Sequence, residues 1–507
     1  MPPRIIRLHD EDNVVVARVG LAAGFALPGE KAVTRAPVPS GHKIATRAIA
    51  RGEAIVKYSQ IIGFASGDIA PGDHVHSHNV EVRKVARRYE PGVDVRPTDY
   101  VCEGQRAIFQ GFRRADGRVG VRNYLGILSS VNCSASVARS IAAAFSRPQD
   151  LADFPHVDGV TAFVHGAGCG MQAGGEGHEN LKRVLAGYAR HPNLAGVLMV
   201  GLGCEVAQLS EIVAQHGLEP GPLLRILTIQ EAGGTRRTIE AGVAAIRAML
   251  PLADRARRET IAASELVLAL QCGGSDAYSG IAANPALGAA ADLLVRHGGT
   301  AILSETPEIY GAEHLLVRRA ASAGVAQKLI DRITWWEDYV ARNGGAIDNN
   351  PAPGNKAGGL TTILEKALGA AAKGGTTNLV DVCRYGEAAG ARGLVFMDSP
   401  GYDPVSVTGQ LAAGATVVCF TTGRGSVFGC KPAPSLKIAT NTPMYQRMSE
   451  DMDINCGEIV DGKAGIGDMG ARIFAKILDV ASGAKSKSEA LGLGDNEFAP
   501  WQIGAVM

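Results

Sequence analysis

The sequence predicts a multidomain protein in which a small all-β N-terminal domain is followed by α/β domains with mainly parallel sheets. Short segments rich in β-branched residues dominate roughly the first 80 residues, whereas apolar segments of five to eight residues alternate with alanine-rich stretches from Phe109 onward. A length of 507 residues suggests about three domains, and a hydrophobic content of 46% is enough to bury a core in each.

The N-terminal domain is predicted to span residues 1–82. Its strands lie in "NVVVARV" (13–19) and "AIVKYSQIIGFA" (54–65), and the turns "PGE", "SGHK", "RGE" and "PGD" punctuate the segment. Residues 83–108 are charged and contain two prolines, so we expect them to form a linker.

Two α/β domains are expected after the linker, at residues 109–255 and 256–507. Their strands are "YLGILSSV", "GVTAFVHG", "GVLMVG" and "LLRILTI", and then "ELVLALQ", "TAILSE", "NLVDV", "GLVFMDS" and "ATVVCFTTG". Continuous apolar strands followed by helices are typical of buried parallel sheets. The polar segment "PLADRARRETIAASE" (251–265) is predicted to be a helix at the boundary between the two domains.

Charge and cysteine content exclude several function classes. The chain has 51 basic and 50 acidic residues, so it lacks the charge excess that binds nucleic acid or an anionic membrane. The N-terminus lacks a signal peptide's apolar core and no apolar run approaches a membrane span, so we expect a cytoplasmic protein. The nine cysteines are then expected to be reduced thiols, and none forms a C-x-x-C pair.

Cysteines follow four of the predicted strands, at Cys133, Cys169, Cys204 and Cys272. The first three are 36 (133 to 169) and 35 (169 to 204) residues apart, the spacing of successive strand–helix–strand units. Because the carboxyl ends of parallel strands meet at one edge, we expect these thiols to converge there. A single cysteine is more often a small buried hydrophobe, but this set beside glycines favours iron or an iron–sulfur cluster. Three thiolates would leave one iron open for the hydroxyl and carboxylate of a hydroxy acid.

Histidines occupy alternate positions in "GDHVHSHN", at His74, His76 and His78. In a strand these side chains share one face, which suits a divalent metal or an acidic ligand, although a solvated hairpin end explains the pattern equally well. His42 and Lys43 lie in "SGHK", a turn of the same domain.

Glycine-rich loops in the last domain carry the predicted substrate-binding residues. Glycines let backbone amides approach an anion, and arginine can bind a carboxylate with two hydrogen bonds. The loops "QCGGSDAYSGIAANP", "NPAPGNKAGG" and "FTTGRGSVFG" supply Ser275, Asp276, Ser279, Asn284, Asn355, Lys356 and Arg424. Glu305 in "SETPE" follows another strand and is expected to be a solvated loop acid.

No nucleotide-binding motif accompanies these loops. The segments "GAGCGMQAGG" and "GLGCEVAQ" come close to the dinucleotide pattern but lack its third glycine. Neither is followed, about 20 residues on, by an acidic residue at a strand end. A nicotinamide-dependent dehydrogenase is therefore disfavoured.

Several long motifs, in the same order along nearly the whole chain, resemble those of the altronate and galactarate dehydratases. They are "NVVVARVGLAAG", "GHKIA", "HVHSHN", "FRRADGRVGVRNYLGILSSVNC", "VGLGCE", "QCGGSDAYSGIAANP", "NPAPGNKAGG" and "FTTGRGSVFG". The resemblance implies an N-terminal β-clip domain of the SAF type, a second domain and a large C-terminal catalytic domain. It also implies loss of water from a sugar acid to give a 2-keto-3-deoxy acid, with iron or manganese as cofactor.

Within this family the resemblance leaves the substrate open. The motif "HVHSHN" is similar to the altronate branch, whereas "LLVRHGG" and "DMDINCGEI" are closer to the galactarate branch. Related members release sulfite from sulfolactate. We expect altronate as substrate, with galactarate or a sulfonated hydroxy acid as alternatives and a non-catalytic sugar-acid binding protein as a competing class. A homodimer is compatible with the sequence, which leaves the oligomeric state open.

The expected mechanism has a metal that stabilises the enediolate formed when a base removes the C2 proton. Its first-choice ligands are Cys133, Cys169 and Cys204, with Cys272 as a fourth or neighbouring ligand. His165 and Glu205 are candidate bases, and Lys356 and Arg424 are expected to bind carboxylate. The small domain would bring His42, His74, His76 and His78 over the site, or hold a separate Fe²⁺ or Mn²⁺ on them.

Overall fold

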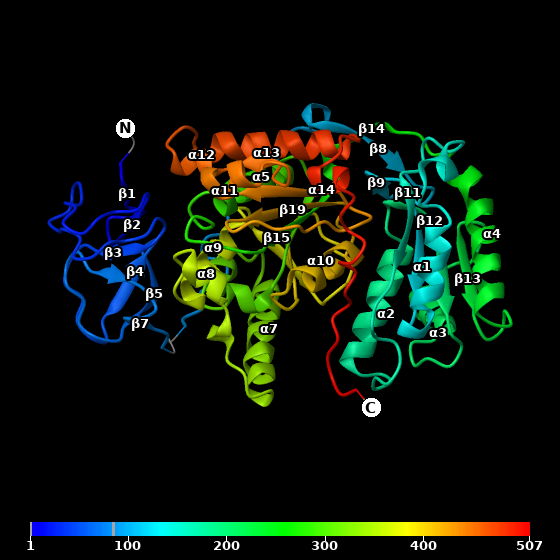
Figure 1. Ribbon diagram of the computed structural model, residues 1–507, viewed down its shortest axis with the longest axis horizontal. Helices are drawn as coiled ribbons and strands as arrows, with labels where there is room; N and C mark the ends of the chain where they lie inside the picture. Colours follow the sequence, from blue (N-terminus) through cyan, green and yellow to red (C-terminus); the bar gives the residue numbers. More distant parts are fainter. Residues whose placement is uncertain (1–2, 84–86, 507) are drawn as a thin grey trace.

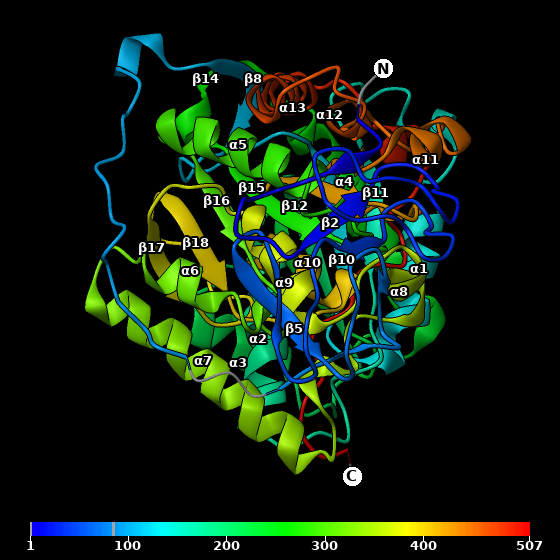
Figure 2. The ribbon, with the colours of Figure 1, turned by 90° about the vertical axis from the view of Figure 1, so that its left-hand side faces the viewer.

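The computed structural model describes residues 3–83 and 87–506, which form three bodies along the longest axis of the molecule (Figure 1). The N-terminal sheets lie at one end, the second body lies at the other, and the C-terminal body stands between them although it comes last in the chain. Figure 2, turned by 90°, places the N-terminal sheets in front of the C-terminal body. Residues 84–86 of the predicted linker, together with 1, 2 and 507, lie outside the described residues.

The N-terminal body is all-β, as predicted, and it contains two small antiparallel sheets. One has the order β1-β2-β3-β6 and the other β4-β5-β7. Their strands are β1 (Ile5–Ile6), β2 (Val14–Ala17), β3 (Lys43–Ala45), β4 (Ala54–Lys57), β5 (Gln60–Ala65), β6 (His74–Val75) and β7 (Val80–Glu81). β-Branched side chains such as Val14, Ile55 and Ile62 fill the core against the C-terminal body, which ties the two parts into one hydrophobic cluster.

The hairpin between β4 and β5 has an unusual turn. Tyr58 and Ser59 both have positive φ, at 61° and 54°, a conformation that costs energy for residues other than glycine. The backbone N–H of Ser59 donates to the Asp12 carboxylate at 2.9 Å and holds the turn. Strained turns of this kind concentrate at functional sites, and Tyr58 lines the cavity described below.

Residues 87–102 run along the C-terminal body, where the backbone N–H of Asp94 donates to the Arg318 carbonyl at 2.8 Å. The chain then forms β8 (Ile108–Arg113) and β9 (Val119–Gly120), which make an antiparallel sheet with β14 (Glu259–Ala262). The predicted helix over 251–265 is therefore wrong. Helix α4 (Thr235–Ala253) ends at Ala253, and Ile261 is buried in a strand instead because a β-branched residue suits pairing with β8.

The second body is a four-stranded parallel sheet in the order β11-β10-β12-β13. Helices α1 and α4 cover one face of the sheet, and α2 and α3 cover the other. These elements are β10 (Tyr124–Ser129), α1 (Ala135–Ala143), β11 (Gly159–Phe163), α2 (Glu176–Ala189), β12 (Leu194–Gly201), α3 (Leu209–His216) and β13 (Leu224–Thr228).

The C-terminal body is built on a seven-stranded parallel sheet in the order β17-β18-β16-β15-β19-β20-β21. The chain passes from β15 to β16 on one side, and β19 pairs on the other side, so the direction of winding reverses at β15. In such sheets the ligand binds outside the carboxyl ends of the strands at this reversal. The strands are β15 (Val267–Cys272), β16 (Thr300–Leu303), β17 (Leu379–Cys383), β18 (Gly393–Met397), β19 (Val417–Thr422), β20 (Ser435–Ala439) and β21 (Ile454–Asn455).

Helices cover both faces of this sheet. Helices α5, α9 and α13 belong to the hydrophobic cluster on one face and α10 to the cluster on the other, while α7 contributes to both. The helices are α5 (Ala283–Arg296), α6 (Glu313–Val317), α7 (Ala323–Arg342), α8 (Pro353–Ala357), α9 (Ile363–Ala372), α10 (Asp403–Ala412), α11 (Thr442–Arg447), α12 (Gly457–Val460), α13 (Ile466–Ala481) and α14 (Lys487–Ala490). Among the described residues, none of the helices has both the length and the apolar character that crossing a bilayer requires.

Candidate functional site

The four predicted cysteine ligands are divided between two sheets. Cys133, Cys169 and Cys204 follow β10, β11 and β12 at the carboxyl edge of the second body, whereas Cys272 ends β15 in the C-terminal sheet. The expectation that all four thiols converge at one sheet edge is therefore wrong for Cys272, because β15 belongs to a different sheet. The three thiols of the second body are exposed, and Cys272 is buried.

His165 and Glu205, the two candidate bases, are held by the loops that carry the three thiols. The Nε2 of His165 lies 3.0 Å from the Ser129 carbonyl, and its Nδ1 accepts from the backbone N–H of Ala167 at 3.1 Å. Glu205 accepts from the Ser130 hydroxyl at 2.7 Å and from the backbone N–H of Gly203 at 2.6 Å. Both side chains are thus committed to bridging neighbouring loops.

A buried acid–lysine cluster surrounds Cys272 at the carboxyl edge of the C-terminal sheet. The Nζ of Lys373 lies 2.9 Å from the Sγ of Cys272 and 3.3 Å from Glu305. Lys366 pairs with Glu308 at 2.7 Å. Lys366 lies in α9 and Lys373 caps the C-terminus of that helix, and both glutamates follow β16. Within the described residues, Cys272, Glu305 and Glu308 are the group whose donor atoms all lie close enough together to bind one metal ion.

Glu305 was expected to be a solvated loop acid, and this is wrong: it is 1% exposed. Its backbone has a φ of 74°, so the chain holds a non-glycine residue in a strained conformation to place this carboxyl group. Burial and the neighbouring Glu308 raise the pKa of Glu305, because both disfavour its charged form. Gln271 at the end of β15 donates to Glu305 at 2.8 Å and to Asp403 at 2.9 Å.

Acid groups outnumber cations in this cluster, and the pKa directions are consistent with that excess. Burial raises the pKa of Glu308, but Lys366 and Lys373 outweigh that effect and keep Glu308 ionised. Burial raises the pKa of Cys272 to about 12. Three carboxyl groups, with Asp403 as the third, therefore face two ammonium groups, and a proton held by Glu305 relieves the excess negative charge.

The predicted substrate-binding residues of the first loop lie beside this cluster. Ser275, Asp276 and Asn284 line a narrow cavity together with Tyr58, Cys272, Glu365 and Lys366. Asp276 accepts hydrogen bonds from the Thr440 hydroxyl at 2.9 Å and the Asn441 amide at 3.0 Å. The free volume is about 10 Å³, room for about one water molecule, so the structure has a closed site.

Asn355, Lys356 and Arg424 lie around the same loop. Asn355 donates to the Ser275 carbonyl at 2.8 Å and so ties α8 to the loop. The backbone N–H of Arg424 donates to the Gly274 carbonyl at 2.9 Å, while its side chain is exposed. Neither Lys356 nor Arg424 has an ion-pair partner among the described residues.

The N-terminal histidines pack over α8. The N-terminal body lies on the opposite side of the C-terminal body from the second body, whose strands precede the three exposed thiols (Figure 1). The Nδ1 of His42 lies 2.9 Å from the Nε2 of His74. The Nε2 of His76 donates to the Lys356 carbonyl at 2.9 Å, and the rings of His42 and His76 stack at 4.8 Å. Burial, reinforced by neighbouring rings, lowers the pKa of His42 and of His74 to about 4, so both are neutral at pH 7. Within one chain these histidines cannot cover the three thiols.

A buried ion triad joins the N-terminal body to the C-terminal body. Lys43 and Lys57 approach the Glu365 carboxylate at 2.8 and 2.9 Å, and all three side chains are at most 1% exposed. Burial alone raises the pKa of Glu365, but the two ammonium groups hold it well below its ordinary value. Glu365 neighbours Lys366 on α9, so the interface and the acid–lysine cluster share one helix.

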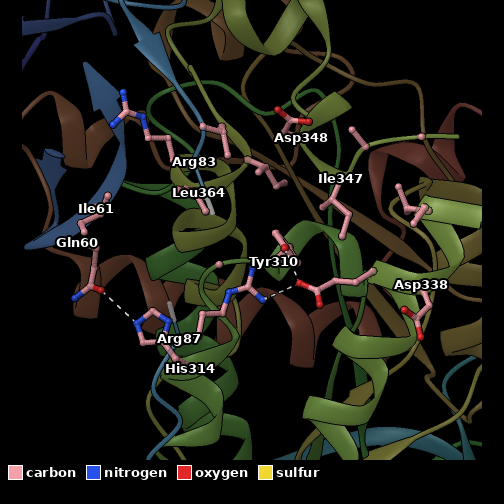
Figure 3. A pocket seen from close by; sticks show the side chains of 18 of the residues that line it. Gln60, Ile61, Arg83, Arg87, Tyr310, His314, Asp338, Ile347, Asp348 and Leu364 are labelled. Atoms are coloured by element: carbon pink, nitrogen blue, oxygen red, sulfur yellow. Dashed lines mark hydrogen bonds and ion pairs between the residues drawn. The ribbon is translucent and has the colours of Figure 1, made fainter. Parts of the chain in front are cut away.

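A larger hollow of about 700 Å³ opens beside this interface, between β5 and helices α6, α7 and α9 (Figure 3). Figure 3 shows His314 directed toward Gln60, with the ring nitrogen 3.2 Å from the amide oxygen. The cation of Arg87 pairs with Glu313 at 3.0 Å and lies over the ring of Tyr310. The sequence-predicted site residues do not line this hollow.

Sequence reasoning missed Glu308, Lys366, Lys373, Glu365 and Lys57. A signal for three of them was present in "TTILEKALGAAAKGG", where charged residues interrupt an otherwise apolar, alanine-rich helix. Charged side chains are rarely fully buried unless they pair with an opposite charge. The pattern therefore predicts oppositely charged partners from other parts of the chain.

Comparisons with known proteins agree with the arrangement of three bodies. Family models match the altronate/galactarate dehydratase SAF domain at residues 3–83, the D-galactarate dehydratase/altronate hydrolase second domain at 111–254 and the D-galactarate/altronate dehydratase C-terminal part at 263–506.

Three relatives show how far the similarity extends. Altronate dehydratase of Bacillus subtilis (strain 168) is 38% identical over 461 residues, 90% of each chain. Galactarate dehydratase (L-threo-forming) of Escherichia coli (strain K12) is 37% identical over 513 residues, 99% of this chain and 97% of that protein. For (2R)-sulfolactate sulfo-lyase of Chromohalobacter salexigens, subunit beta is 31% identical over 76% of this chain and 95% of its own length. Subunit alpha is 36% identical over 15% of this chain and 93% of its own length. The chain belongs to the D-galactarate/altronate dehydratase family.

Proposed function

We propose that the protein is a hydro-lyase that removes water from a six-carbon sugar acid to give a 2-keto-3-deoxy acid, with altronate as the first candidate and galactarate as the second. The observation that carries the proposal is the buried cluster of Glu305, Glu308, Lys366 and Lys373 at the winding reversal of the C-terminal sheet. Loss of water next to a carboxylate needs a base for the α proton and positive charge for the enediolate. Relatives named altronate and galactarate dehydratase support this reaction class.

Glu305 is the group we assign to proton transfer, because its raised pKa lets it both accept and return a proton near neutral pH. Lys373 lies 3.3 Å away and stabilises the negative charge that develops on the substrate. Asp276 and Asn284 bind hydroxyl groups, and the free cations of Lys356 and Arg424 bind carboxylate. The departing hydroxyl receives its proton from an acid of the same cluster.

A divalent metal, iron first and manganese second, fits the acid excess of this cluster. Cys272 and Glu308 would hold it beside Glu305, whose carboxyl group stays free to act as the base, since a thiolate and a carboxylate suit Fe²⁺ or Mn²⁺. When bound, the metal supplies Lewis-acid polarisation of the substrate oxygens. His42 and His74 form the alternative donor pair, because their Nδ1 and Nε2 atoms face each other at 2.9 Å and the Nε2 of His42 lies 3.4 Å from the Ala357 carbonyl, an orienting contact that is common at metal sites.

Turnover is expected with at least one of the two sugar acids. Purified, reduced and metal-loaded protein should form a keto acid from altronate, galactarate or both, measured as the semicarbazone together with the loss of substrate. Sulfolactate serves as the matched test for the alternative leaving group, with sulfite release as readout. Saturable binding of the acids without any product would contradict the enzyme proposal and indicate a binding protein.

Manganese binding distinguishes the two donor sets, because Mn²⁺ does not build iron–sulfur clusters. Cys272→Ser is expected to weaken Mn²⁺ binding by roughly tenfold or more, measured by electron paramagnetic resonance of the free ion. The double variant His42→Ala/His74→Ala is the matched comparison and is expected to bind Mn²⁺ like the unaltered protein. The opposite result would move the metal to the histidines.

A further inference from the structure

We propose that Cys133, Cys169 and Cys204 form a three-thiolate site for an iron–sulfur cluster in the second body, separate from the acid–lysine cluster. The three thiols follow adjacent strands of one sheet, in the spatial order β11-β10-β12, and so stand side by side at its carboxyl edge. The proposal uses none of the residues to which the proposed function assigns proton transfer, substrate binding or the mononuclear metal.

Exposure separates these thiols from ordinary core cysteines. Five of the nine cysteines are buried, which is usual for a small hydrophobic side chain. Four are exposed, and three of those four stand at this one edge. The residues beside them, Ala167, Ser134 and Glu205, are buried, so the loops turn the sulfur atoms outward while their flanks stay packed. A packing role does not explain that arrangement.

The three loops are fixed to one another by hydrogen bonds. The backbone N–H of Asn132, beside Cys133, donates to the Ala167 carbonyl at 3.0 Å, which joins the first loop to the second. The backbone N–H groups of Val206 and Ala207 donate to the Gly168 carbonyl at 3.0 and 3.1 Å, which joins the third loop to the second. His165 and Glu205 add the bridges described above, so they act as positioning residues for the thiols.

Close approach at Gly168 requires the absence of a side chain. Gly168 has a φ of 103°, and a Cβ there would lie 2.3 Å from the Ser130 carbonyl oxygen. In "GAGC", Gly168 therefore lets the loop that carries Cys169 approach the end of β10. The result is a prearranged set of thiols, as a ligand site requires.

A cluster suits this set better than a single ion. Within the described residues, the three sulfurs do not meet the spacing of ligands that share one ion. In an iron–sulfur cluster each thiolate binds a different iron, so the sulfurs stand further apart. Gln230 donates to the Sγ of Cys204 at 3.5 Å, and hydrogen bonds to ligand sulfurs are a common feature that tunes such clusters. Three protein ligands leave the fourth iron accessible from solvent.

The test measures iron, acid-labile sulfide and the visible charge-transfer absorbance of protein purified anaerobically and reconstituted with ferrous iron and sulfide. We expect iron and sulfide in equal amounts, and loss of both sulfide and absorbance in Cys133→Ser, Cys169→Ser and Cys204→Ser. Cys102→Ser, which alters the remaining exposed thiol, is the matched control and should keep the cluster. Because the three side chains are exposed, these variants should keep the unfolding temperature of the parent.

Two results would overturn the proposal: no acid-labile sulfide after reconstitution, or unchanged sulfide when all three cysteines are replaced together. The variant Glu305→Gln distinguishes a failure of the iron–sulfur proposal from a failure of the proposed function, because it alters only the acid–lysine cluster. That variant should retain the full sulfide content and absorbance whether or not it loses dehydration activity.

Discussion

Glu305→Gln is expected to lower kcat for dehydration by a factor of about 10²–10⁴, the range that a positioned general acid–base contributes. The amide has the same shape but can neither take nor return a proton, and the strained backbone at this position tolerates the two residues similarly. KM should change less than kcat, because Glu305 is assigned to the proton transfer and not to ground-state binding. Steady-state rates of keto-acid formation measure the effect.

The control is Glu450→Gln, an exposed glutamate in the same body, which should leave kcat unchanged. The pH profile gives a second readout. In the unaltered protein, the basic form of Glu305 increases as pH rises through its elevated pKa, and the variant should lack that limb of the profile. A Glu305→Gln protein with the parental kcat and profile would remove the carboxyl group from the mechanism.

Glu365→Ala is expected to destabilise the junction of the N-terminal and C-terminal bodies by about 3–5 kcal/mol, because it leaves two buried ammonium groups without a counter-charge. Lys43 and Lys57 are at most 1% exposed and share this carboxylate, so water cannot replace it without opening the interface. The midpoint of the first urea-induced transition and the rate of proteolytic release of the N-terminal body measure the loss.

Acid should produce the same loss in the unaltered protein. The pKa of Glu365 is depressed by folding, so its stabilising contribution is complete above the ordinary carboxyl pKa of about 4.3 and is lost as pH falls below it. The stability difference between the parent and Glu365→Gln should therefore narrow on acidification. A triple replacement of Lys43, Lys57 and Glu365 by methionine is the control, because burying an apolar set avoids the unpaired charge. If Glu365→Ala unfolds like its parent at pH 7, the triad does not hold the interface.

Periodicity and strand-end chemistry predicted the fold class and part of the site. Strand runs such as "ELVLALQ" and "GVLMVG" are long and apolar, so burial in parallel sheets follows from hydrophobicity alone. The loop carrying Ser275 and Asp276 was found because polar residues directly follow such a strand. Glycine-rich strand ends likewise identified the thiols of the second body.

The remaining parts depend on contacts that no local pattern contains. The sequence predicts a solvated Glu305 because the burial of this residue depends on α9 and its C-terminal cap, about 60 residues further along the chain, where Lys366 and Lys373 complete the cluster. Cys272 shares the strand-end position of the other cysteines, but its strand β15 pairs with β16 and β19, which come later in the chain, and so belongs to the C-terminal sheet. An ion pair between two bodies, such as Lys43 with Glu365, cannot be predicted from a short stretch of sequence, because its two residues are far apart in the chain.

The tie between Lys43, Lys57 and Glu365 has a consequence for how the N-terminal body is kept in place. The sulfo-lyase relative distributes its similarity to this chain over two separate subunits, whereas here one polypeptide carries both parts. A covalent connection turns docking into an intramolecular event, with an effective concentration on the order of millimolar for a short flexible tether. The covalent connection keeps the N-terminal body near the C-terminal body but does not orient it. The charge triad orients it, because the three charged groups meet in only one arrangement of the two bodies. Because the two bodies are linked, their interface needs a lower binding affinity than an interface between separate subunits. Its residues then serve mainly to fix the relative position of the two bodies.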